Sequence, residues 1–462
     1  MGRAPATNGE VGTASDPNSS LTAYATVCAI GVATVFLSNW PIYSFDILGG
    51  PPPIWYFLIA CVVVIPIAFA DPASVAGLMK APIFWWFATY VVLGLLWLLG
   101  SQDFIEDGSR LWRLRLIQFF FLCAVMMLCV HAQRHALALV ILACVVLATA
   151  FNWFDLMRPF RFVPQGIEGS NPGRGAGMFI NANAAAEIVV VGTIAALPFV
   201  PMRFRAMALV IMIVGVAPTL SRGGLILAAI VSIGAIVSRL LNRVQCAVLL
   251  IAIPLLVLVA VISFDRLAEA ADSPLERTLA RLVQFEGEGD GYSTEARKWA
   301  AAQAKDMIFE RPILGSGIGA TTREAVDEGP HNMYLMLAAE QGVFGLVLYL
   351  SLIGMLSWGG RQLSWTGRAV ETQDVGKAMM LFAAYYAVGG VFSHNMLEAA
   401  YGIFALGFLG IAAMKGARGD LDSWRHTTLP ERLHWRSSIP SVQSTAGRMV
   451  NGRSQGDVLG RN

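Results

Sequence analysis

The chain has 462 residues, of which 56% are apolar and 14% are charged, compared with about 25% charged residues in a soluble domain. This composition excludes an ordinary soluble enzyme, a disordered chain and a coiled coil, whereas the net charge of +2 excludes nothing. A membrane-spanning helix needs about 20 mostly apolar residues, so the apolar content suffices for ten to twelve spans. We therefore predict an all-α integral membrane protein with about 12 transmembrane helices.

Apolar runs separated by polar residues or by Gly and Pro predict where the spans lie. They occupy about 21–40, 53–70, 82–99, 116–130, 135–151, 184–201, 206–220, 223–238, 245–264, 335–358, 378–393 and 398–414. The predicted order is a cytoplasmic N-terminal segment (1–20), a bundle of about nine spans (21–264), a large loop (265–334), three last spans (335–414) and a basic, disordered cytoplasmic tail (415–462).

The charge of the tail predicts the orientation of the bundle. An even number of spans leaves both termini on one side, and basic flanking segments favour the cytoplasm. The loops 152–183 and 265–334 then face the outside, where several arginines accumulate: Arg110, Arg113, Arg115, Arg158, Arg161, Arg174, Arg222, Arg266 and Arg297. Arginine at membrane depth is costly, and its planar guanidinium suits phosphate. Snorkelling to lipid phosphates explains single arginines, and an anionic ligand on the outer face is the interpretation of the set.

The large loop contains a predicted helix at 294–309 that lies on the membrane face and does not span it. Its apolar stripe is Ala296, Trp299, Ala300, Ala304 and Met307, and Arg297 sits at the stripe's edge. Arg297 is interpreted either as a solvated charge or as a residue turned toward the membrane. Pro312 ends the helix, and the Gly-rich stretch 314–320 follows. EGEGDG (286–291) is interpreted as a flexible acidic loop rather than a calcium site, and Asp420-Leu421-Asp422 as a chance match to a metal motif.

His331 precedes a span in the segment PHNMYLMLAAEQGVFG (330–345). A histidine can accept a proton from a hydroxyl near neutral pH, so it is a candidate general base, although the chemistry of the residue alone favours an ordinary interfacial histidine. A second His-Asn pair begins at His394. The six cysteines lie in or beside apolar runs and predict neither disulfides nor a zinc site.

Four segments, in order, resemble the O-antigen ligase family of polytopic bacterial glycan transferases. The segment 330–345 is similar to its H-N-x-x-L and E-x-G-x-x-G signature, RGAGMFINANAAAE (174–187) to its R…G-x-x-x-N-x-N-x-x-A element, and LSRGGLILA (220–228) to its S-R-G element. RKWAAAQAKDMIFERPILGSGIG (297–319) resembles the R-x-x-x-W…P-x-x-G-x-G element, with Arg297 closer to Trp299 than in the family pattern. The matching residues are Arg174, Gly177, Asn181, Asn183, Ala186, Ser221, Arg222, Gly223, Pro312, Gly315, Gly317, His331, Asn332, Leu335, Glu340, Gly342 and Gly345.

The resemblance implies a glycosyltransferase at the periplasmic face of the bacterial inner membrane, acting in lipopolysaccharide biosynthesis. It would move a glycan from undecaprenyl diphosphate to an acceptor hydroxyl, without a cofactor or metal and without nucleic acid. Its partners would be the lipid-linked donor, a lipid A-core or growing-glycan acceptor, and membrane lipids. The implied catalytic residues are His331, Arg222 and Arg174, and the implied substrate-binding residues are Arg297, Asn332, Asn181, Glu340 and His394.

Several alternatives remain open. An O-antigen ligase uses the lipid A core as acceptor, a polymerase extends O-antigen or exopolysaccharide, and a protein O-oligosaccharyltransferase modifies Ser or Thr. The His-Asn form of the signature and the lack of an extra soluble domain favour the first two. A lipid-linked glycan transporter or flippase is a different class, for which internal repeats of the two halves are expected; none is seen between 21–238 and 245–414.

Overall fold

The computed structural model describes residues 17–100, 105–164, 173–251, 291–322 and 329–419. All regular elements within these ranges are helices, which confirms the predicted all-α class. Residues 420–462 of the predicted basic tail, residues 286–290 of the acidic segment and most of the run 245–264 lie outside the described residues.

Nine helical segments in the described ranges are long and apolar enough to cross a membrane. They are α1 (Pro17–Leu37), α3 with α4 (Pro53–Val62, Ile65–Ala70), α6 (Pro82–Gly100), α7 (Ile105–His131), α8 (Arg134–Met157), α9 with η2 (Ala182–Ala196, Leu197–Phe199), α10 between η3 and η4 (Met202–Phe204, Arg205–Val216, Ala217–Thr219), α15 (Met333–Thr366) and α17 (Ala400–Ala417). The chain is thus a multi-pass membrane protein, and the count of twelve spans stays a prediction.

The other helices are shorter, or they are less apolar. They are α2 (Trp40–Leu48), α5 (Pro72–Leu78), η1 (Gly177–Phe179), α11 (Arg222–Val237), α14 (Gly291–Glu310), η5 (Ala320–Thr322) and α16 (Val370–Gly389). Helix α11 matches the short predicted run at 223–238. Helix α14 ends just before Arg311-Pro312, as predicted, because a helix rarely continues into the residue that precedes proline.

Two helices begin earlier than the apolar runs predict. Helix α16 begins at Val370, and α7 begins at Ile105, so Arg110, Arg113 and Arg115 belong to a helix rather than to the end of an outer loop. A polar residue interrupts an apolar run but need not end a helix. Arginine, which precedes the apolar part of α7, has a good helix propensity, as do glutamate, glutamine and lysine. Arg115 differs further from the prediction, because it is only 1% exposed.

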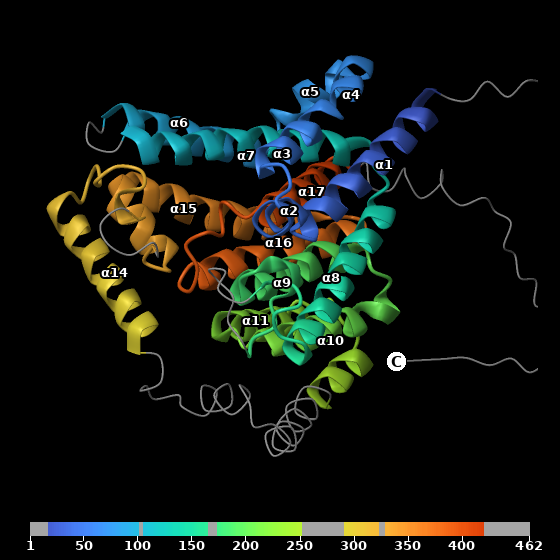
Figure 1. Cartoon of the computed structure of the whole chain (residues 1–462). Helices are drawn as coiled ribbons and strands as arrows, with labels where there is room; N and C mark the ends of the chain where they lie inside the picture. Colours follow the sequence, from blue (N-terminus) through green and yellow to red (C-terminus); the bar gives the residue numbers. More distant parts are fainter. Residues whose placement is uncertain (1–16, 101–104, 165–172, 252–290, 323–328, 420–462) are drawn as a thin grey trace, which may run out of the picture. The chain divides into compact units, whose positions relative to one another are not determined.

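Helix α9 forms the centre of the helix packing and contacts α8, α10, α11, α16 and α17. Its residues from Ala185 to Ala196 are all buried, and most of them are small or β-branched. Helices α15 and α16 pack along each other, α6 packs on α7, and α14 lies against α15 (Figure 1). The predicted stripe of α14 is confirmed in part, since Ala300 and Ala304 are buried while Trp299 is 46% exposed.

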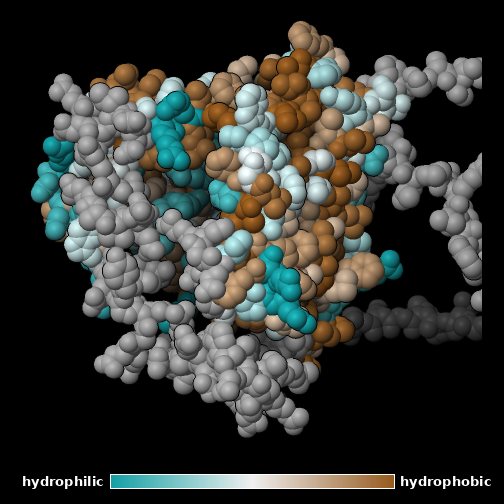
Figure 2. Space-filling view, viewed as in Figure 1, coloured by the Kyte–Doolittle hydropathy of each residue, from teal (hydrophilic) through white to brown (hydrophobic). Residues whose placement is uncertain are grey.

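Large apolar side chains also cover much of the outer surface seen in Figure 2. Phe69, Leu99 and Val237 are each more than 70% exposed. Exposed apolar surface on this scale is unusual for a soluble monomer and is expected where lipid covers the protein.

Ion pairs concentrate at the end of the bundle that is predicted to be cytoplasmic. Arg134 pairs with Glu371 at 2.5 Å, and Asp374 pairs with both Arg205 and Lys377 at 2.7 and 2.8 Å. Arg174 and His394 follow the opposite ends of two of the helices that carry these ion pairs, α8 and α16.

Candidate functional site

A tight turn between α8 and α9 positions Arg174. Its guanidinium donates from Nε to the carbonyl oxygen of Thr219 (2.9 Å) and from Nη2 to Oδ1 of Asn183 (3.0 Å). The turn itself is held by Asp155, whose Oδ2 accepts hydrogen bonds from the backbone amides of Ala176 and Gly177. Arg174 is therefore oriented by a buried scaffold rather than carried on a free loop.

The glycine after Arg174 is required by close packing. A Cβ atom on Gly175 would overlap the carbonyl group of Asn152 in α8. We expect Gly175→Ala to displace the turn and lower activity severalfold or more, with the protein still present in membranes. Gly31→Ala is the matched control, since a Cβ there meets nothing within 4 Å. Equal activity of both variants, measured by glycan transfer in isolated membranes, would contradict this account.

Arg222 occupies the first turn of α11. Leu220 has a positive φ of 49°, so the chain turns sharply, and the Ser221 hydroxyl then caps the helix by accepting from Gly224 N at 3.1 Å. Thr219, whose carbonyl oxygen accepts a hydrogen bond from Arg174, lies three residues before Arg222. The turn that carries Arg174 therefore lies beside the turn that leads into α11. The partial positive charge of a helix N-terminus adds to this cationic region.

The start of α11 packs against the segment that carries His394. A Cβ atom on Gly223 would lie 3.1 Å from Cβ of Phe392, two residues before His394. A Cβ atom on Gly224 would overlap Ala186 of α9. Small residues after Arg222 therefore bring α9, α11 and the segment 390–399 together at one end of the bundle.

His331 immediately precedes the cap of α15. It has a positive φ of 46°, which is uncommon for a residue other than glycine and recurs at functional sites. Asn332 caps the helix, with its Oδ1 accepting from Leu335 N at 3.0 Å, and Met333 N donates to Gly390 O at 2.7 Å. The amide of Asn332 thus holds the helix start that places His331.

His331 and His394 lie edge to face, with ring centroids 5.0 Å apart and an interplanar angle of 81°. A Cβ atom on Gly329 would lie 3.1 Å from Nε2 of His394. Burial, with the neighbouring His331 as a smaller cause, lowers the pKa of His394 to about 4. His394 is therefore a neutral imidazole at pH 7.

The buried imidazole of His394 predicts an acid-sensitive fold. An unfolded histidine has a pKa near 6.5, so between pH 6.5 and 4 the folded chain binds fewer protons there than the unfolded chain. The free energy of unfolding should fall as the pH drops through this range, by roughly 3 kcal/mol in total. Thermal unfolding of the purified protein from pH 7 to 4 measures the loss. His394→Gln should reduce this pH dependence, and an unchanged dependence would contradict the assignment.

Glu187 supports this segment from inside α9. Its carboxylate accepts from Tyr401 (2.9 Å) and Tyr385 (3.3 Å), and Ser393 beside His394 also hydrogen-bonds to it. A buried carboxylate is costly without such donors, so the three hydroxyl groups connect α9, α16 and α17 firmly beneath His394.

Glu340 lies apart from the two histidines, nine residues beyond His331. Its Oε1 accepts from the hydroxyl of Thr321 at 2.7 Å, and its Oε2 lies 4.0 Å from Nη2 of Arg115. The Gly-rich stretch packs closely on this part of α15, where Gly317 N donates to Glu340 O and the helix breaks at Gly342 (φ 62°). Glu340 anchors the segment that connects α14 to His331.

Asn181 and Arg297 are the remaining two predicted site residues, and they lie at two different helices. Asn181 caps α9 by accepting from Asn183 N at 2.8 Å, so it borders the Arg174 turn. Arg297 lies on α14, and its side chain is outside the described residues. The structure therefore brings Arg174, Arg222, His331, Asn332, Asn181 and His394 to one end of the bundle, and it places Glu340 deeper along α15.

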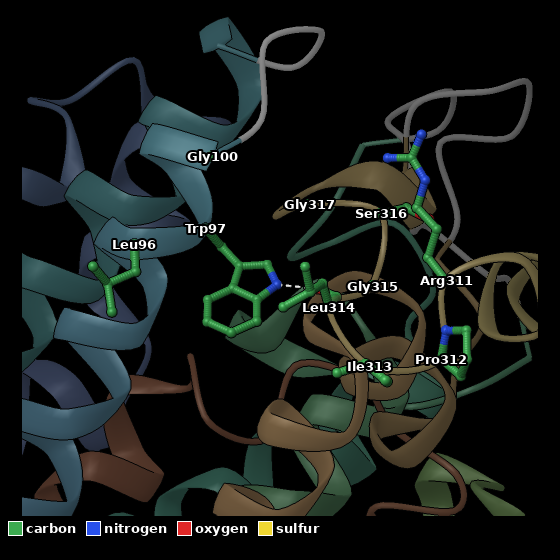
Figure 3. Close-up of a pocket in the computed structure, with 10 residues that line it drawn as sticks. All are labelled: Leu96, Trp97, Gly100, Arg311, Pro312, Ile313, Leu314, Gly315, Ser316 and Gly317. Carbon is green, nitrogen blue, oxygen red and sulfur yellow. Dashed lines mark hydrogen bonds between the residues drawn. The ribbon is translucent and has the colours of Figure 1, made fainter.

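An apolar cavity of about 560 Å³ lies between α6 and the segment 311–317 (Figure 3). Trp97 points from α6 toward this segment and donates from its indole N–H to Leu314 O. Leu96, Ile313 and Leu314 line the cavity and are more than half exposed, and Arg311 is the charged residue of its wall.

Sequence reasoning did not select Asp155, Thr321 or Arg115 as site residues, and it noted Asn183 only as part of a motif. Each acts on a partner distant in sequence, so spacing carries no signal for it. Within the described ranges, no three His, Cys, Asp or Glu side chains gather as a metal site requires.

Residues 207–350 match a family model described as O-antigen ligase. The match covers α10, α11, α14 and the first half of α15, and it includes Arg222, Arg297, His331, Asn332 and Glu340. Arg174, Asn181 and His394 lie outside it but pack against it. No curated protein matches the chain.

Proposed function

We propose a function from the premise that this chain is a transferase carrying the domain of the O-antigen ligase family, a family of ligases and polymerases of glycans. The chain moves a glycan from undecaprenyl diphosphate to an acceptor hydroxyl at the periplasmic face of the bacterial inner membrane. The observation that carries this proposal is that the turns of Arg174 and Arg222 lie at the same end of the bundle as the ring pair of His331 and His394.

The two arginines act on the leaving group. When the bond between the anomeric carbon and the diphosphate breaks, negative charge develops on the diphosphate oxygens. Guanidinium groups bind such oxygens with charge-assisted, bidentate hydrogen bonds. A group held in place before the reaction lowers the barrier most, and Arg174 is held by Thr219 and Asn183.

His331 is the proposed general base. It accepts the proton of the acceptor hydroxyl as that oxygen bonds to the anomeric carbon and the undecaprenyl diphosphate departs. Asn332 and the bond from Met333 to Gly390 hold its backbone in the required conformation, and His394 packs against its ring. Arg297 is a further candidate for diphosphate binding from the loop helix.

The apolar cavity beside Trp97 suits the isoprenoid chain of the donor. Its exposed Leu96, Ile313 and Leu314 provide apolar surface at the edge of the bundle, where a lipid can enter laterally. The Gly-rich segment that forms its wall is anchored by Glu340 and leads toward His331. A donor lying there would have its headgroup directed toward the polar end of the bundle.

The proposal is tested in strains that carry no protein, wild type or His331→Ala, with membrane levels checked. Lipopolysaccharide is examined on gels, and undecaprenyl-diphosphate glycans are identified by mass. A missing ladder with long lipid-linked polymer in the null and His331→Ala strains identifies a ligase. Single lipid-linked repeats identify a polymerase. A loss of glycan from proteins alone identifies the protein-directed enzyme, and a His331→Ala strain equal to wild type favours a transporter.

A further inference from the structure

A second cavity, of about 450 Å³, is lined by residues other than those of the apolar cavity beside Trp97. Its wall comes from the end of α1, from α2 and α3, from Leu114 and Gln118 of α7, from the start of α9 and from the segment 395–401. This volume falls within the range of small-molecule sites, about 300–1,000 Å³.

The lining of this cavity combines hydrogen-bonding groups with aromatic rings. The hydrogen-bonding residues are Asn39, Gln118, Asn181, Asn395, Glu398 and Tyr401, and the aromatic rings also include Phe36, Phe57 and Phe179. Among its described lining residues there is no Lys, Arg or His. Such a wall suits a neutral ligand with many hydroxyl groups and an apolar face, and it does not suit a diphosphate.

Gln118 gives this cavity a hydrogen-bond acceptor with no protein partner among the described residues. Its side chain is 1% exposed, and its Nε2 donates to the carbonyl oxygen of Glu398 at 2.7 Å. Its Oε1 is buried without a hydrogen-bond partner. Buried amide oxygens are nearly always satisfied in proteins, so this atom has an open acceptor position that a hydroxyl of a bound molecule or an ordered water can fill.

The cavity borders the candidate catalytic end directly. Asn395 in its wall follows His394, and Asn181 caps the helix whose Asn183 holds Arg174. The separate apolar cavity beside Trp97 suits the donor lipid. A second substrate entering through the polar cavity would therefore meet the donor at the arginines and histidines.

We propose that this cavity binds a sugar ring of the acceptor, with the Oε1 atom of Gln118 accepting a hydrogen bond from a sugar hydroxyl. The inference rests on the proposed transferase function and adds the acceptor subsite to it. Asn39, Asn181 and Asn395 contribute further amides, and Phe179 and Tyr401 contribute aromatic surface for the apolar face of the ring.

The test uses the purified full-length protein with undecaprenyl-diphosphate-linked glycan and, as acceptor, lipid A-core lacking O-antigen or the lipid-linked repeat. Initial rates are measured against the concentration of each substrate separately. Gln118→Leu should raise KM for the acceptor roughly tenfold while KM for the donor stays unchanged, because one buried hydrogen bond to the acceptor is lost. Asn395→Ala should act in the same direction. Ala184→Phe, which fills the cavity without removing a polar group, should also raise the acceptor KM.

Gln373→Leu is the matched control. Its amide also donates to a backbone carbonyl, that of Gly367 at 2.9 Å, but it lies at the opposite end of the bundle. It should leave both KM values at the wild-type level.

The outcomes separate the inference from the proposed function. If wild type transfers glycan and the three cavity variants keep the wild-type acceptor KM, the subsite is wrong and the function stands. If the variants raise the donor KM instead, the cavity binds the donor sugar and the assignment to the acceptor is overturned. If wild type transfers glycan neither to these two acceptors nor to a protein, the proposed function itself is wrong.

Discussion

Replacing Arg222 by alanine is expected to lower the turnover number of glycan transfer by about 100- to 1,000-fold. Removing one preorganised group that stabilises developing negative charge costs a factor of this size in other enzymes. Arg222→Lys should retain part of the activity, because lysine keeps the charge but lacks the bidentate fork. The measurement is the steady-state rate with purified protein at saturating donor.

The control for Arg222 lies at the other end of the same helix. Arg239 is exposed just beyond the end of α11, and Arg239→Ala should transfer glycan at the wild-type rate. Comparable rates for Arg222→Ala and wild type would show that this arginine does not act on the leaving group. A rate lost together with the folded protein would instead assign Arg222 to the structure of the turn after Leu220.

Breaking the buried contact between Arg115 and Glu340 is expected to have the largest effect on stability. Arg115 is 1% exposed and Glu340 is 2% exposed, and the Arg115 guanidinium also lies 4.5 Å from the ring centroid of Tyr90. Arg115→Met leaves Glu340 without this cation in a region that water does not reach. Loss of one partner of a buried ion pair typically costs about 3–5 kcal/mol of unfolding free energy.

A double variant distinguishes the ion pair from simple packing. Arg115→Met with Glu340→Gln removes both charges and should recover a large part of the stability lost in Arg115→Met. Arg113→Met is the control on the same helix, because Arg113 is exposed and bonds only to Ser109 one turn away. It should change the unfolding free energy by no more than about 0.5 kcal/mol. Unfolding in detergent solution measures these variants and the single variant Glu340→Gln, and additive effects of the two single substitutions would exclude coupling between Arg115 and Glu340.

The helices and the all-α fold class could be predicted from local patterns in the sequence. The runs around Val189 and Phe404 are apolar over about five turns, and no other regular structure satisfies their backbone groups in lipid. The proline after Arg311 likewise acts on its own segment, so its effect on the end of α14 was predictable without the fold. The glycines after Arg222 predicted a sharp turn, but only the fold shows that they pack against α9 and Phe392.

The positions of polar side chains within the membrane were less predictable. Arg115 was expected on the outer face, and the structure buries it beside Glu340 and Tyr90. Hydropathy measures the cost of burying a charge, but it does not show which distant groups offset that cost. The role of Asp155 was not predictable for the same reason. Its carboxylate, near the end of α8, accepts a hydrogen bond from the turn that carries Arg174, and hydropathy does not reveal this contact.

The sequence by itself determined an all-α membrane chain, the match of residues 207–350 to the O-antigen ligase family model and the arginines and histidines of the candidate site, because these depend on composition, periodicity and local spacing. Only the tertiary structure decided that His394 packs on His331, that Glu340 anchors a loop, and that Gln118 faces a cavity. These relations join residues from about 60 to nearly 300 positions apart or depend on a helix break, as at Gly342, and packing alone brings such groups into contact.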